Sequence, residues 1–195
     1  MARTAKTVMT PRDSVFNADV RNTVAKLKDL EGGVTNPVSF FEESHFTKGL
    51  TELCKKGFSR LSGEYGNGVF ELTQSMGGGN THSLMSFSLL ARDPELRSSV
   101  LRREGVEQFG AFGSAKIVVF EGEDNLNLPY GLWGEIARQL RKLQEFSQFY
   151  SPLSAPSTGA WTRLIGDEPG NSTFTIICSL NARWRLEFSI PPILQ

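Results

Sequence analysis

The chain has 195 residues, a length that allows one principal domain, or one domain with a helical appendage. Lysine plus arginine and aspartate plus glutamate number 21 each, so the protein has no overall field that attracts nucleic acid or an anionic membrane, and only a local basic patch could do so. The longest uncharged run, Leu72 to Ala91, is a poor membrane span because glycines and polar residues interrupt it.

The N-terminus and the cysteines favour a cytoplasmic protein. Arg3 and Lys6 are followed by no apolar stretch, so we expect no secretory signal. Cys54 and Cys178 are isolated and lack metal-ligand spacing, so both thiols are expected to be reduced and structural.

Residues 1–62 are predicted to form an N-terminal helical extension. A broken helical stripe runs over 13–30, and a short aromatic helix follows over 38–46. Thr47 is the expected N-cap of a longer helix. The apolar positions of that helix fall on one face: Leu50, Leu53, Cys54, Gly57, Phe58 and Leu61.

Strands and helices alternate after residue 62. A short strand over 69–73 is followed by a glycine cluster and by a largely buried helix over 84–90. A more polar helix covers 95–103, and 117–120 is a continuous apolar strand of the kind found in parallel sheets. The first part of the chain therefore has the element order of an α/β unit.

The same alternation continues toward the C-terminus. Residues 132–146 are predicted to form one amphipathic helix, and a Pro/Ser loop covers 151–157. A short helix over 161–165 and a strand over 173–178 complete the pattern. This order is typical of a right-handed α/β fold with a parallel sheet.

The glycine cluster, QSMGGGNT at residues 74–81, has the layout of a phosphate-binding loop. A P-loop joins a strand to a helix through G-x-x-x-x-G-K-[ST], because successive backbone N–H groups must converge on phosphate oxygens. The sequence matches at Gly79 and Thr81 and differs at Gln74 and Asn80. Spacing alone supports a structural turn equally well, but three consecutive glycines between a strand and a helix favour the phosphate loop.

Residues 69–97, VFELTQSMGGGNTHSLMSFSLLARDPELR, resemble a family of large, mostly uncharacterised bacterial and archaeal AAA-like P-loop ATPases that are often encoded beside DNA methyltransferases or phage-defence genes. The family loop reads L-T-Q-x-M-G-G-G-K-T-H, so Gln74 is a family trait and Asn80 is the departure. The segments FFEESHFTKGLTEL, PYGLWGEIARQL and YSPLSAPSTGAWTRLIGDEP are similar to family segments as well. The resemblance covers roughly residues 10–169.

The resemblance implies an α/β fold of the P-loop NTPase type: an incomplete parallel sheet flanked by helices, with a partial core at 63–169 and strand 117–120 beside the P-loop strand. It implies ATP and Mg²⁺ as cofactors, with the hydroxyl of Thr81 directed to the metal. His82 is expected to pack near the phosphate end of the loop, in a structural role rather than a catalytic one. No catalytic residue is assigned. The residues expected to hold the nucleotide are Met76, Gly77, Gly78, Gly79, Asn80, Thr81 and His82.

Two departures from the family indicate an impaired enzyme. Asn80 replaces the lysine that holds the β- and γ-phosphates, and a charged hydrogen bond contributes roughly 1.5 to 3 kcal/mol against about 0.5 to 1.5 for a neutral one. Relatives continue after GDEP into a hydrophobic strand that ends in Asp-Glu, whereas this chain has no carboxylate from Gly170 until Glu187. We hypothesise a frameshift or truncation near Gly170, with 170–195 as an atypical tail that leaves the sheet incomplete.

Other charged residues are predicted to be ordinary. Two histidines without cysteines or clustered carboxylates do not make a zinc site. Carboxylates that follow strand 117–120 are expected in a solvated loop, and a basic helix face is expected to be solvated rather than bound to DNA. These residues are Glu121, Glu123 and Asp124 in the loop, and Arg138, Arg141 and Lys142 on the helix.

Three functions remain open from the sequence. The first is a truncated or degenerate AAA-like ATPase with weak ATP binding and impaired hydrolysis. Its relatives' association with DNA modification and phage defence suggests DNA or a DNA-modification protein as partner. The second is a non-catalytic nucleotide-sensing or oligomerisation module, and the third is an inactive gene remnant.

Overall fold

The computed structural model describes residues 26–32, 36–64, 67–72, 79–106, 112–121, 128–166, 174–180 and 183–189. Three of the expected nucleotide ligands, Met76, Gly77 and Gly78, lie outside these ranges, as do Glu123 and Asp124. The predictions for these five residues therefore stay predictions.

The N-terminal region is helical in its described part. Helices α2 (Asp29–Gly32), α3 (Pro37–Glu43) and α4 (Lys48–Leu61) follow one another along the chain. The Oγ1 atom of Thr47 accepts the N–H of Leu50, so the expected N-cap of α4 is confirmed. The apolar face predicted for α4 is buried at all six positions: Leu50, Leu53, Cys54, Gly57, Phe58 and Leu61.

Four strands form one sheet with the order β1-β4-β3-β2. They are β1 (Val69–Leu72), β2 (Lys116–Glu121), β3 (Phe174–Leu180) and β4 (Arg183–Ser189). Strands β2 and β3 are parallel, and β4 is antiparallel to both β3 and β1, so β1, β2 and β3 run in the same direction.

The expectation that strand 117–120 lies beside the strand before the glycine loop is wrong, because β4 and β3 separate β2 from β1. The two central strands both come from the segment 170–195, which was expected to leave the sheet incomplete. In β4, the residues from Trp184 to Glu187 pair with β1 on one side and with β3 on the other. The tail hairpin thus joins β1 to the rest of the sheet.

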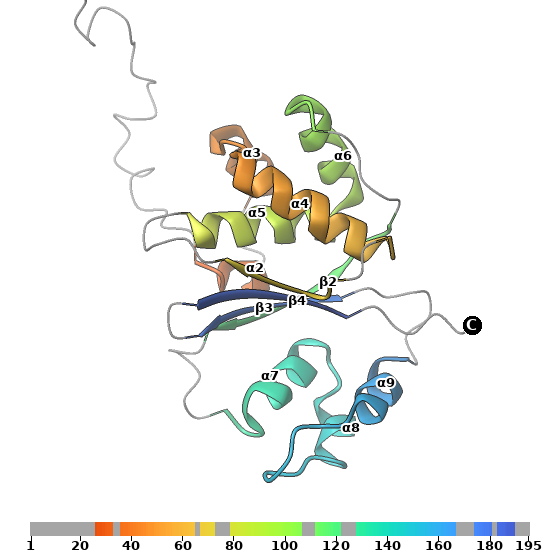
Figure 1. The fold of residues 1–195 in the computed structure, drawn as a ribbon. Helices are drawn as coiled ribbons and strands as arrows, with labels where there is room; N and C mark the ends of the chain where they lie inside the picture. The colour runs from red at the N-terminus through yellow and green to blue at the C-terminus, as the bar shows by residue number, and fades with distance from the viewer. Residues whose placement is uncertain are drawn as a thin grey trace, which may run out of the picture.

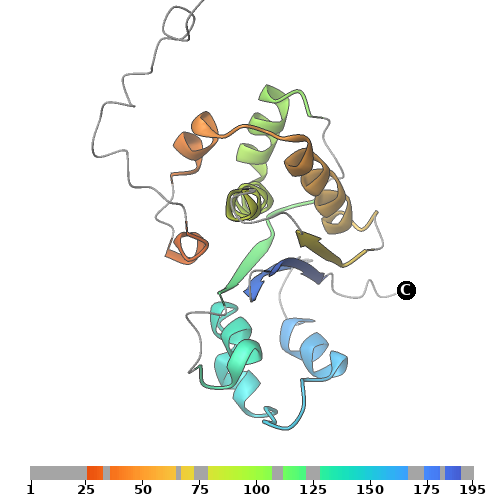
Figure 2. The ribbon, with the colours of Figure 1, turned by 60° about the vertical axis from the view of Figure 1, so that its left-hand side comes forward.

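Helices cover both faces of the sheet, as Figures 1 and 2 show. Helices α3, α4, α5 (Asn80–Arg92) and α6 (Pro94–Arg103) lie on one side. Helices α7 (Gly131–Gln139), α8 (Leu143–Ser147) and α9 (Thr158–Gly166) lie on the other. The molecule is therefore layered helix–sheet–helix.

The single helix predicted over 132–146 is wrong, because the chain breaks between α7 and α8. Arg141 has a φ of 60°, a left-handed conformation that an α-helix cannot continue through. The N–H of Lys142 bonds to the carbonyl of Ala137 at 2.7 Å, and the N–H of Arg141 bonds to the carbonyl of Arg138 at 3.0 Å. This pair of bonds is a Schellman motif, which terminates α7.

The main core forms around α5, whose residues from Leu84 to Ala91 are all buried. The ring of Phe87 in α5 stacks on Phe58 of α4 at 5.0 Å between ring centroids. A smaller cluster on the other face of the sheet contains Ala137, Phe146 and Leu164.

A buried guanidinium closes the C-terminal end of this core. Arg97 of α6 is 9% exposed and donates to the carbonyl oxygens of Leu90 (3.1 Å) and Phe112 (2.6 Å). Its Cζ atom lies 3.7 Å from the centroid of the Phe112 ring. Arg97 therefore ties the end of α5 to the segment that leads into β2, and the cation–π contact adds to this link.

Replacing Arg97 with methionine should lower the free energy of unfolding by about 2 to 4 kcal/mol, because buried carbonyl groups would lose their donors. Urea unfolding followed by circular dichroism measures the change. The matched control is Arg102→Met at the exposed Arg102 of the same helix. Equal stabilities of the two variants would contradict the assigned role of Arg97.

Candidate functional site

The glycine loop connects the C-terminal end of β1 to α5. Strand β1 ends at Leu72 and α5 begins at Asn80. In the strand register Leu72 lies opposite Trp184 of β4, and Glu121 at the end of β2 lies opposite Ser179 of β3. The C-terminal ends of β1, β2 and β3 therefore lie at the same end of the sheet, which is where open α/β sheets bind their ligands.

Gly79 is the residue that turns the chain into α5. Its φ of 78° and ψ of 24° lie in the left-handed region, where glycine carries no steric cost. A Cβ atom added at Gly79 would meet no atom of the described residues within 4 Å. Gly79 is the N-cap residue and offers α5 no side-chain hydrogen bond, and the N–H of Ser83 bonds to the carbonyl of Gly79. The N–H groups of the first turn point along the helix axis, as in helices that bind anions.

Asn80 is the first residue of α5 and is only 7% exposed. Asn80 has an interaction partner. A neutral amide is tolerated at a buried position when it is hydrogen-bonded, whereas an ammonium group there must extend toward water or an anion. Thr81 follows it and is half-buried.

His82 packs against the N-terminal helices. Its ring stacks on Phe40 of α3, with 4.8 Å between the centroids and 24° between the planes. Burial lowers the pKa of His82 below its usual value of 6.5, so the imidazole is neutral at pH 7. The contact agrees with the expected structural role. The sequence marked 38–46 as an aromatic helix, but no local pattern pairs Phe40 with a histidine 42 positions later.

Metal and thiol chemistry find no support in the described residues. Within that part of the chain, no group of three or more His, Cys, Asp or Glu side chains could hold a metal ion. Glu121 is half-buried at the end of β2 and has a partner. Burial raises the pKa of the Cys54 thiol, which is fully buried, so this cysteine is protonated and structural as expected.

The comparison with protein families assigns the chain to one of them. The DUF499 N-terminal domain family matches residues 12–129, which is more than half of the chain. The chain belongs to the DUF499 N-terminal domain family. The DUF499 span contains α3 to α6, β1, β2 and the whole glycine loop, and it ends just before α7. It crosses the expected boundary at residue 62.

No curated protein and no solved structure matches the chain. Among the helices of the described ranges, none is long and apolar enough to cross a membrane.

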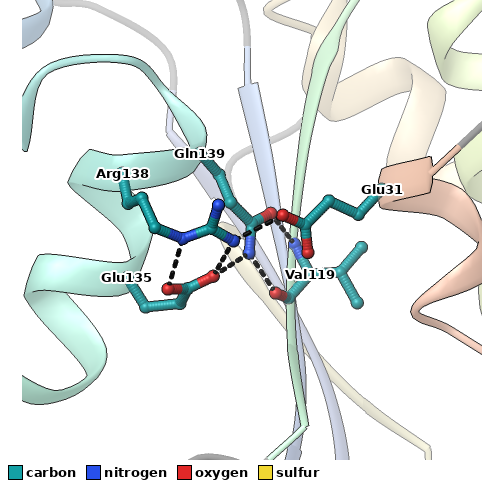
Figure 3. A network of polar contacts seen from close by, with 5 residues as sticks. All are labelled: Glu31, Val119, Glu135, Arg138 and Gln139. Carbon is teal, nitrogen blue, oxygen red and sulfur yellow. Dashed lines mark hydrogen bonds and ion pairs between the residues drawn. The ribbon is translucent and has the colours of Figure 1, made fainter. Parts of the chain in front are cut away.

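A polar network of α7 side chains, which follow the DUF499 span, closes the outer edge of β2 (Figure 3). The side chain of Gln139 in α7 accepts the N–H of Val119 at 2.9 Å and donates to its carbonyl at 2.6 Å. The amide of Gln139 therefore pairs with the edge strand as a neighbouring backbone would. Glu135 accepts from Gln139 at 2.7 Å and holds it in place.

Arg138 anchors the same network, and its side chain is exposed, as the prediction of a solvated helix face requires. Its guanidinium donates to Glu135 at 2.7 Å and to Glu31 of α2. The hydrogen bond from Arg138 holds the pKa of Glu135 below its ordinary value, and the bond to Glu135 raises the pKa of Arg138. The network thus links α2, α7 and β2, which come from three separate parts of the sequence.

The free energy of unfolding should fall as the pH drops from 7 to 5.5, with His82 contributing. The folded state disfavours protonated His82, so the unfolded state binds more protons and gains stability below pH 6.5. Urea unfolding at several pH values measures this slope. His82→Phe should reduce it. An unchanged slope in His82→Phe would contradict the assignment.

Replacing Gln139 with alanine should expose the edge of β2 and lower the free energy of unfolding by about 1 to 2 kcal/mol. An open edge pairs with other chains, so light scattering should detect dimers or larger species at high concentration. Gln144→Ala at an exposed position of α8 is the control. If the two variants behave alike, Gln139 does not protect the edge.

Proposed function

We propose that this chain is the N-terminal part of a degenerate AAA-like P-loop ATPase, whose loop from Met76 to His82 binds an adenine nucleotide weakly and supports little hydrolysis. One observation carries the proposal. The glycine-rich segment leads into a left-handed Gly79, which is the N-cap of the buried helix α5 and offers it no side-chain hydrogen bond. On this proposal, the layered sheet is an incomplete P-loop core with a helical extension.

The residues at this end suit phosphate better than they suit a metal ion. Backbone N–H groups of the loop and of the first turn would hold the phosphates, and these donors do not depend on the side chain at residue 80. The hydroxyl of Thr81 would direct Mg²⁺ bound to the nucleotide. When bound, Mg²⁺ neutralises charge on the phosphates.

Two features support impaired hydrolysis. Asn80 is neutral and buried, so it offers no point charge to the transferred phosphoryl group. Strand β3 is followed by no acidic pair, because the sequence from Gly170 to Leu186 contains no carboxylate. Without both groups, binding is expected to weaken about tenfold and turnover to fall further.

The sheet topology favours a second candidate, a non-catalytic nucleotide-sensing or oligomerisation module. Strands β3 and β4 are central and pair with β1 and β2, so the tail is integrated into the same sheet. An inactive gene remnant would not require such integration. A cytoplasmic location, and DNA or a DNA-modification protein as partner, rest on family analogy.

Asn80→Lys should restore nucleotide affinity. We expect MgATP to bind the natural chain weakly, and to bind the variant at least about tenfold more tightly because a charged contact replaces a neutral one. Isothermal titration calorimetry measures binding, and phosphate release measures turnover. Gln144→Lys adds the same charge at a distant exposed position and should change neither.

The outcomes separate the candidates. Turnover that appears only in Asn80→Lys supports the degenerate ATPase. Tight binding without turnover by the natural chain supports the module. The absence of binding by both proteins, with folding verified by circular dichroism, would overturn the nucleotide site and favour the remnant.

A further inference from the structure

A hollow lies where β2 begins, at the opposite end of the strands from the glycine loop. It has a volume of about 370 Å³ and is bounded by the C-terminal ends of α5 and α7 and by the start of β2. The N–H of Ala115 bonds to the carbonyl of Ala91, which fixes the first strand residues against the end of α5. A hollow of this size falls within the range of small-ligand pockets.

In the described part of the chain, three cationic residues and no carboxylate line the hollow. Arg92 is the last residue of α5, Lys116 is the first of β2, and Arg141 follows α7. Within the described ranges, Arg92 uses one nitrogen for the carbonyl of Leu30, and neither Arg92 nor Arg141 forms an ion pair. The nearby carboxylate of Asp93 is committed to capping α6.

Arg141 occupies a position that favours glycine. Its left-handed φ of 60° is the conformation that the Schellman motif requires after α7. Glycine adopts this conformation without strain, whereas an arginine stores strain there. Strained backbone positions cluster at functional sites, and the Arg141 side chain lines the hollow.

We propose that this hollow binds a phosphate group, supplied by a small phosphorylated molecule or by a nucleic-acid strand. A phosphate group carries one or two negative charges and several acceptor oxygens, and guanidinium groups pair with these in a bidentate geometry. The site lies at the other end of α5 from the glycine loop, so it does not depend on the proposed nucleotide site. It is a local basic site in a chain of zero net charge.

A structural explanation competes with this proposal. Arg92 and Arg141 lie at helix C-termini, where cations offset the negative end of the helix dipole. If that were their only role, Arg141 would contribute to stability and not to binding. The two explanations therefore predict opposite results for the same substitution.

The test uses inorganic pyrophosphate as probe and Arg141→Gly as the variant of the full chain. The proposal predicts that the affinity falls about tenfold or more, because one charged contact is lost. The melting temperature should stay level or rise, because glycine relieves the strained position. The control is Arg102→Gln, which removes a charge from an exposed position that does not line the hollow. Calorimetry at low ionic strength measures binding.

Further arms identify the source of the phosphate. Tighter binding of a ten-residue thymidine oligonucleotide than of pyrophosphate assigns the site to a nucleic-acid strand, and the reverse order assigns it to a small molecule. The gain in ATP affinity on changing Asn80→Lys should be the same with and without Arg141→Gly, which separates this site from the loop. The proposal is overturned if the natural chain binds neither probe, or if Arg141→Gly lowers the melting temperature and leaves affinity unchanged.

Discussion

The burial of helix α5 is the constraint on which the rest of the structure depends. Its residues from Leu84 to Ala91 are all inaccessible, so they hold α4, α6 and the sheet around one core. A helix in such a position needs partners for the backbone groups at both ends. The two ends meet this need in different ways.

The C-terminal end of α5 is closed by the protein itself. The guanidinium of Arg97 bonds to the carbonyl of Leu90, the hydroxyl of Ser114 bonds to the carbonyl of Arg92, and the N–H of Ala115 bonds to that of Ala91. At the N-terminal end the cap residue is Gly79, which has no side chain to offer the backbone N–H groups. This asymmetry is the physical reason to look for an external anion at the glycine loop, and the proposed nucleotide site rests on it.

The sheet is protected at its β2 edge by side chains from a region beyond the DUF499 span. Gln139 pairs with the backbone of Val119, and the guanidinium of Arg138 donates hydrogen bonds to Glu135 and Glu31. The hollow proposed for phosphate also combines residues from both regions, because Arg92 and Lys116 lie within the family span and Arg141 lies after it. The segment that follows residue 129 thus completes both features.

Local sequence determined the features that a few neighbouring residues can encode. The N-cap of α4 at Thr47, the buried face of α4 and the apolar strand β2 follow from side-chain hydrogen bonds and periodicity within one element. The local sequence pattern identified the glycine loop, and Gly79 has the left-handed geometry that only glycine adopts freely. The expected ligands Met76 to Gly78 stay predictions.

Only the tertiary structure decided the order of the strands, the break between α7 and α8, and the partners of Arg97, Arg138 and Gln139. These depend on contacts between residues far apart in the chain: Arg138 meets Glu31 across 107 positions, and β4 enters the sheet beside β1. The helical spacing of apolar residues continues without a break through Arg141. Such spacing carries no information on backbone strain, so it did not reveal the break. Long-range packing fixes such features, and a local pattern cannot specify them.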